Sequence, residues 1–276
     1  MMSWNWRGIR AVIRKDLLVV FKNKMVIAPM LLLPVIFTFI MPLLVGVLYL
    51  NAPSGSNSIN EFESLMQNMP MTDPFFESVD SSQAKSLYLI YMYLFVPFFL
   101  ILPVMTGSIV AADSFAGEKE RKTLEALLHT PLSDFELYFA KWLSPLITSM
   151  IVSLLGAVVY GVVVNLVMSR GFGLIIFPNL TWVVLLLWVV PAVTCMGLGV
   201  TVWVSSRVST FQEAYQAGAY VILPIMMLFI AQAGGVVYLD VSASIILGAV
   251  VWAFDAFLFS LGGRRFSRGA ILSRLA

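Results

Sequence analysis

Hydrophobic positions along this chain gather into six long runs separated by polar stretches. Each run holds at least 20 residues, about the length that an α-helix needs to cross the hydrocarbon core of a bilayer. Backbone polar groups must be satisfied internally at that depth, which favours helices. We therefore predict an all-α integral membrane protein with a single transmembrane domain, residues 1–276. The six spans are expected at residues 25–50, 87–112, 142–168, 180–204, 213–232 and 243–263.

A basic stretch precedes the first run. Within residues 4–24, apolar side chains recur at helical spacing while the cations point elsewhere, which is typical of a helix lying in the membrane interface. The apolar members are Trp6, Ile9, Ile13, Leu17 and Val20. The run Met25–Leu50 has 26 residues without a charge, longer than the roughly 7–15 residues of a cleavable signal segment. It is therefore expected to remain as the first span.

Prolines interrupt several of the spans. Pro29, Pro34 and Pro42 fall in the first span and Pro224 in the fifth. A proline removes a helical hydrogen bond and clashes with the preceding turn, so we expect kinks whose freed carbonyls are bonded by neighbouring helices. Residues 233–242 fit either a turn or a short re-entrant element.

Two of the connections are long. Residues 51–86 are polar and are expected to form an external loop. Residues 113–135 join the second span to the third, and within them Ser133 and Glu136 have the spacing of a capping box. We expect the third helix to begin at this box and to carry Lys141 at the protein surface.

Composition and charge support a membrane protein and set its orientation. The chain is 60% hydrophobic and 12% charged, with a mean hydropathy of +0.92, whereas soluble domains carry about 25% charged residues. A net charge of +2 gives no reason to expect nucleic acid as a partner. With six crossings and both termini in the cytoplasm, only Lys85 and Arg170 of the 17 Lys and Arg residues lie outside. This asymmetry obeys the positive-inside rule.

One cytoplasmic stretch, Gly117–Pro131, concentrates charge between two apolar runs. It holds six charged residues within nine positions, and Glu118–Lys122 and Arg121–Glu125 have the i, i+4 spacing of helical ion pairs. An apolar patch follows, made of Leu124, Leu127 and Leu128. A helix facing water has no reason to carry such a patch unless it packs on a partner.

Motifs for covalent or metal chemistry are missing from the sequence. It contains one histidine, His129, and one cysteine, Cys195, and it lacks the HExxH and GxSxG patterns. It also lacks the GxxxxGK[ST] loop that binds nucleotide phosphates. We expect a non-catalytic protein with no cofactor or metal of its own, so that any use of ATP requires a partner.

Asp255 is the acidic residue placed deepest in a span. It lies nine residues before Arg264, roughly 13 Å along a helix and so near the middle of the membrane. Two interpretations remain open. The residue is a cation or proton site on a transport path, or it is a protonated acid bonded to a neighbouring helix or a second copy. Tyr91 and Phe95 of the second span are further candidates for path residues.

The segment GEKERKTLEALLHTPLSDFELYFAKWL resembles the cytoplasmic segment between the second and third spans of type-2 ABC exporter permeases. The agreement comprises Gly117, Glu118, Lys119, Glu120, Arg121, Thr123, Leu124, Glu125, Leu127, Leu128, Pro131, Leu132, Ser133 and Lys141. Lys122 departs from the pattern, because the family often has glycine there. The basic N-terminal helix, the six spans and the basic C-terminal end extend the resemblance over the whole chain.

The resemblance implies a function and partners. The chain would be the permease subunit of an ABC exporter in a prokaryotic plasma membrane, paired with a second permease copy or a paralogue. Two copies of a separate ATPase subunit would bind ATP and Mg²⁺. Gly117–Pro131 would be the coupling helix, with the helix at 4–24 beside it. The coupling residues would be Gly117, Glu118, Glu120, Arg121, Thr123, Leu124, Glu125, Leu127, Leu128 and Pro131. The alternative is a standalone secondary transporter or ion channel that uses Asp255.

Overall fold

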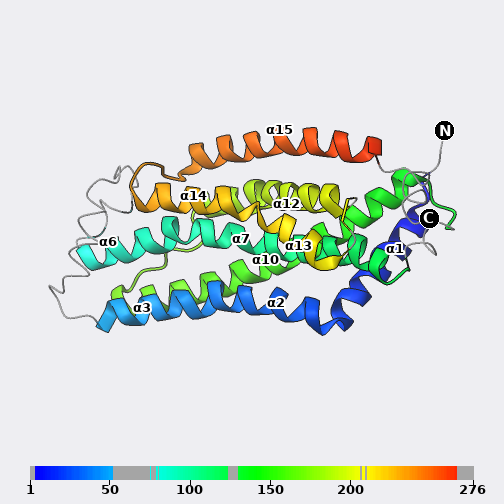
Figure 1. The fold of residues 1–276 in the computed structure, drawn as a ribbon. Coiled ribbons are helices and arrows are strands. Elements are labelled where there is room, and N and C mark those ends of the chain that lie inside the picture. Colours follow the sequence, from blue (N-terminus) through cyan, green and yellow to red (C-terminus); the bar gives the residue numbers. More distant parts are fainter. Residues whose placement is uncertain are drawn as a thin grey trace.

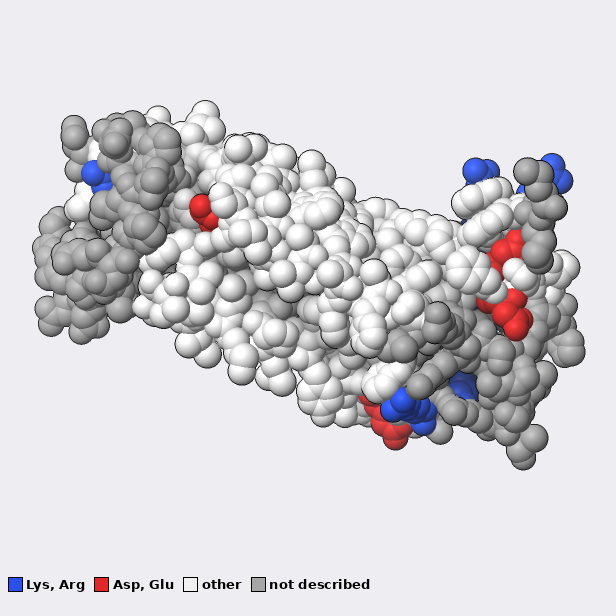
Figure 2. All heavy atoms as spheres, turned by 90° about the horizontal axis from the view of Figure 1, so that it is seen from above, with Lys and Arg blue, Asp and Glu red and all other residues white. Residues whose placement is uncertain are grey.

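The computed structural model describes residues 4–51, 75, 79, 81–123, 130–205, 207–208 and 210–265, and these form a helical bundle without a strand. A short helix, α1 (Trp6–Lys22), lies at one end of the bundle at an angle to the long helices (Figure 1). Six helices among the described residues are long and apolar enough to cross a membrane, which confirms the predicted fold class. On the face shown in Figure 2, charged side chains lie toward the two ends and leave the middle uncharged.

Each span except the third and the sixth consists of several helical pieces. The first span is built from α2 (Lys24–Pro34), the π-helix η1 (Val35–Ile40) and α3 (Met41–Asn51). The second is built from α6 (Ser82–Leu89), the π-helix η2 (Ile90–Leu94), α7 (Val96–Ala112), the π-helix η3 (Asp113–Gly117) and α8 (Glu118–Glu120). The third is the single helix α10 (Asp134–Phe172). The fourth span is built from α11 (Leu180–Val184), the π-helix η4 (Leu185–Val189) and α12 (Val190–Ser205). The fifth is built from α13 (Phe211–Ala219) and α14 (Ile222–Ala233). The sixth is the single helix α15 (Val241–Arg265). The second span is therefore longer at both ends than the predicted 87–112.

The second span forms the centre of the bundle. Its most apolar window is 83% buried, against 50% or less for the other five spans. Helix α7 is apolar on all sides, as a helix surrounded by other helices must be. The first span, at 17%, packs along one narrow face only. A displacement of the second span would therefore be felt by most of the bundle.

Aromatic side chains close the outer half of the core. At the π-helical turn η2, the Tyr160 hydroxyl donates to the Tyr91 carbonyl at 2.6 Å, and the Trp182 indole donates to the Met92 carbonyl at 3.1 Å. The Tyr91 hydroxyl in turn donates to the Pro42 carbonyl at 2.7 Å. Carbonyls at this π-helical turn are thus bonded by side chains of neighbouring helices.

The fifth span is broken where the sequence indicates. Helix α13 ends at Ala219 and α14 begins at Ile222, so the break includes Tyr220. The ring of Pro224 would clash with the carbonyl of Tyr220, four residues earlier, in a continuous helix. Between α14 and α15 the chain turns without a further helix, which fits the turn alternative for residues 233–242.

Candidate functional site

The second span continues beyond the predicted boundary at Ala112 and reaches the charged stretch without interruption. After η3 and α8, the Thr123 amide donates to the Glu118 carbonyl at 2.9 Å and the Lys122 amide to the Lys119 carbonyl at 3.1 Å. These two bonds form a Schellman motif, in which the residue directly after the C-cap adopts a left-handed backbone conformation. Lys122 occupies that position with φ of 58°. Glycine, the residue that the resemblance to type-2 ABC exporter permeases leads us to expect there, would adopt this left-handed backbone without strain.

Glu118 lies inside the protein and bridges three helices. Its side chain accepts hydrogen bonds from Lys15 of α1 and, at 2.6 Å, from Lys141 of α10. Glu118 is 4% exposed and Lys141 is fully buried. The predicted surface position of Lys141 is therefore wrong. Its side chain is directed inward because it also donates to the Ser114 carbonyl in the π-helical turn η3.

Asp16 extends this cluster into α1. It accepts a hydrogen bond from the Ser114 hydroxyl at 2.8 Å and forms an ion pair with Lys15 at 3.0 Å. Burial alone would lower the pKa of Lys15, but Asp16 and Glu118 outweigh that effect and raise the pKa. The sequence reading did not single out Asp16. The signal was present, because Asp16 is an acid on the buried stripe of α1 that also contains Val12 and Val20.

The next two charges of the stretch bind the start of the fifth span and the residues directly before it. The Lys119 ammonium donates to the Val208 carbonyl at 3.1 Å, and Glu120 accepts from the Phe211 amide at 2.9 Å. Phe211 is the first residue of α13, where unpaired amides and the helix dipole favour a carboxylate.

Arg121 bonds back to the helix that carries it. Its guanidinium donates to Asp113 at 2.8 Å, and this hydrogen bond raises the pKa of Arg121. A Cβ on Gly117 would lie 3.0 Å from the Asp113 carboxylate and 3.2 Å from the Arg121 guanidinium, so glycine leaves room for this bridge. The predicted pair Glu118–Lys122 does not form because Lys122 lies beyond the helix end. The predicted pair Arg121–Glu125 stays a prediction, because Glu125 lies outside the described residues.

Helix α1 packs on the start of the third span, beside the charged stretch as predicted. The Asn5 amide donates to Glu136 at 2.7 Å, while Glu136 and Ser133 form the predicted capping box. Ile9 and Val12 are buried against Leu132, Leu137 and Ala140. Part of the apolar face that we assigned to lipid therefore contacts protein. Other apolar side chains of this helix remain exposed, namely Trp6, Leu18 and Phe21.

The remaining coupling candidates are only partly described. Thr123 closes the helix end through its hydroxyl, which donates to the Glu118 carbonyl at 3.3 Å, and Pro131 is exposed before α10. Leu124, Glu125, Leu127 and Leu128 lie outside the described residues.

The path candidates occupy two different settings. Tyr91 and Phe95 are buried in the aromatic core. Asp255 is 6% exposed, and neither carboxylate oxygen has a hydrogen-bond partner among the described residues. An unpartnered acid within a span is unusual, because burying it without a bond is costly.

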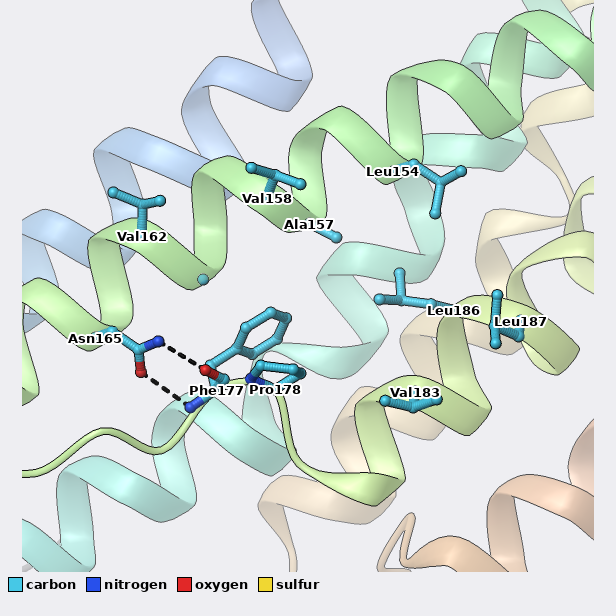
Figure 3. A pocket seen from close by; sticks show the side chains of 11 residues that line it. Leu154, Ala157, Val158, Val162, Asn165, Phe177, Pro178, Val183, Leu186 and Leu187 are labelled. Atoms are coloured by element: carbon cyan, nitrogen blue, oxygen red, sulfur yellow. Dashed lines mark hydrogen bonds between the residues drawn. The ribbon is translucent and has the colours of Figure 1, made fainter.

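A groove of about 630 Å³ lies between α10 and the start of the fourth span (Figure 3). The only amide side chain that lines it, Asn165, is bonded within the protein: it donates to the Phe177 carbonyl at 2.7 Å and accepts from the Ile176 and Phe177 amides. The other lining side chains are apolar, and the groove lies between two spans, so it suits the acyl chains of a bilayer. No cluster of potential metal ligands occurs among the described residues.

Comparison with known proteins gives two matches. The model of a family described as "ABC-2 family transporter protein" matches residues 10–259. The ABC transporter permease protein NatB of Bacillus subtilis (strain 168) is 33% identical over 66 residues. The aligned part covers 24% of this chain and spans 17% of the length of that permease. No solved structure matches the chain.

Proposed function

The chain belongs to the ABC-2 family of transporter proteins, and from this we propose that it is the membrane subunit of an ABC transporter in the plasma membrane. It would form the membrane path and catalyse no covalent chemistry itself. Because the sequence has no phosphate-binding loop, a separate ATPase subunit would bind ATP and Mg²⁺. We further propose that the direction is export, and that two ATPase copies and a second permease copy or paralogue complete the complex.

The charged stretch supports the coupling part of this proposal. It continues the central span and bonds to α1, to the third span and to the fifth. A partner acting on the chain directly after Lys122 would therefore act on a segment that is joined to most of the bundle. This position on the central helix is the observation that carries the proposal.

Copurification tests the proposal directly. When the permease is expressed together with the ATPase subunits of its host and purified, an ATPase should be recovered with it. The rate of ATP hydrolysis by that ATPase should depend on the permease. In a chain whose Cys195 is replaced by serine, a cysteine in place of Leu127 should crosslink to that ATPase. A cysteine in place of Ser169, at the opposite end of α10, is the control and should not crosslink. If no ATPase is recovered, the proposal fails.

Asp255 favours a second candidate, the standalone transporter or channel, because its buried carboxylate has no described partner. Liposomes that contain the permease without any ATPase separate the two functions. We expect no Na⁺ or H⁺ flux under an imposed gradient. A flux that is lost in Asp255→Asn would instead support the second candidate. If Asp255→Asn is silent while Asp255→Leu disturbs assembly, the residue has a structural role.

A further inference from the structure

The four charges Glu118–Arg121 all have partners inside the permease, although the resemblance places them in the coupling segment. We propose that these residues form an internal clamp and are not part of the surface that binds the ATPase. The clamp joins α1 and the cytoplasmic ends of the second, third and fifth spans, so that a force applied beyond Lys122 moves them together. This inference rests on the proposed function and specifies which residues transmit the motion.

Burial separates the clamp from a docking surface. Glu118 is 4% exposed and both of its carboxylate oxygens are bonded, one to Lys15 and one to Lys141. A partner protein could bind this carboxylate only by displacing an ammonium group that is already bonded to it. Glu118 therefore acts by holding α1 and α10 to the central helix.

The two following residues show that exposure alone does not make a docking contact. Lys119 and Glu120 are more accessible than Glu118, yet each is directed at the start of the fifth span. Lys119 bonds to the Val208 carbonyl and Glu120 to the Phe211 amide, and both of these are backbone groups. A partner protein that bound either side chain in their place would have to break these bonds. Lys119 and Glu120 thus join α8 to the beginning of α13.

Helix α13 is well placed to move as a short rigid piece. A Cβ on Gly218 would lie 2.3 Å from the Thr201 hydroxyl and 2.5 Å from the Ser108 hydroxyl, so α13 fits closely against α12 and α7. The helix of the fifth span is interrupted directly after α13, at Tyr220. Pulling on Phe211 through Glu120 would then tilt α13 relative to α14, with the bend at the Tyr220 break.

The experiment measures backbone hydrogen exchange in the complete complex with and without ATP. In the wild type we expect ATP to change exchange across Phe211–Ala219. In Glu120→Ala the ATPase should still be recovered in normal amount, but the ATP-dependent change in α13 should be lost. Glu120→Gln, which keeps an acceptor oxygen for the Phe211 amide, should restore part of the response. This partial rescue separates a positioning role from a general structural one.

The matched control is Asp240→Ala at the other end of the bundle. Asp240 also accepts from a backbone amide at a helix start, that of Ala243 at 2.7 Å, so the substitution removes the same kind of bond. It should leave the response of α13 to ATP unchanged. If Glu120→Ala reduces the amount of ATPase recovered, Glu120 is a docking contact and the clamp is refuted. An unchanged ATP response in Glu120→Ala refutes it as well.

A failure of the proposed function would be recognised separately. If the wild-type permease recovers no ATPase, the clamp is tested in the permease alone. There, Glu120→Ala should raise exchange in the first turn of α13 about fivefold, the effect of losing a helix-capping bond. Equal exchange in the variant and the wild type would show that Glu120 does not hold α13.

Discussion

The central helix is distorted in the same way at both of its ends, but the two ends use opposite chemistry. At the outer π-helical turn, η2, two backbone carbonyls accept from the uncharged side chains of Tyr160 and Trp182. At the inner turn, η3, the Ser114 carbonyl accepts from the ammonium of Lys141, within a cluster of ion pairs. Backbone carbonyls at a π-helical turn are therefore bonded by aromatic side chains at η2 and by a charged side chain at η3.

The difference follows from where each end lies. Aromatic donors satisfy a carbonyl in an apolar core without bringing a net charge into the membrane. Charged donors are suitable only near water, where part of the cluster stays solvated; the Lys15 side chain, for example, is 39% exposed. The outer end of the central helix is therefore stabilised by a packed aromatic core. The inner end is stabilised by charged pairs, in which the loss of one partner leaves the other buried without compensation.

The largest effect is expected where the inner cluster loses its buried cation. Lys141→Met should destabilise the permease by about 3 kcal/mol, because Glu118 remains buried with one partner fewer. The double variant Glu118→Gln/Lys141→Met removes both charges and should recover at least half of that loss. Unfolding of the purified permease in detergent measures both values. A single variant as stable as the wild type would contradict the importance of the inner cluster.

At the outer end a smaller effect is expected, because a neutral bond is lost. Tyr160→Phe removes the hydroxyl that binds the Tyr91 carbonyl and should cost about 1–1.5 kcal/mol in the same unfolding measurement. Tyr220→Phe removes a hydroxyl from a side chain that is 69% exposed and serves as the control. A cost for Tyr160→Phe above that of Lys141→Met would reverse the comparison between the two ends.

The smallest effect concerns the helix end beside the inner cluster. Lys122→Gly should stabilise the permease by up to about 1 kcal/mol, because glycine adopts the left-handed backbone without strain. The greater freedom of glycine in the unfolded chain offsets part of this gain. Lys122→Ala removes the same charge but keeps the strain, so it should bring no gain. Equal stabilities for the glycine and alanine variants would show that the charge, and not the backbone, matters at this position.

Features that depend on neighbouring residues were largely predictable. The number of spans, the capping box at Ser133 and the break near Pro224 each follow from a few adjacent residues. Span ends were less predictable. The second span continues through Asp113 to Glu120 because Ser114, Glu118 and Glu120 find partners on other helices. Their spacing along the chain does not reveal those partners.

The candidate site shows the same division. The resemblance pointed to Gly117–Pro131, but the i, i+4 rule assigned the wrong partner to Glu118. Its actual partners, Lys15 and Lys141, lie 103 and 23 residues away in the chain. The hydrogen bond from Ser114 to Asp16 likewise joins residues that are 98 positions apart in the chain.

By itself, the sequence of this protein determined that it enters the membrane, how often it crosses, and which segment joins the second and third spans. Transfer of apolar residues into lipid and the capping of helices are local effects, so composition and spacing are sufficient for them. Only the tertiary structure decided that the side chains of Glu118–Arg121 bond within the permease. The free energy of a buried charge depends on which distant groups the fold brings within bonding distance.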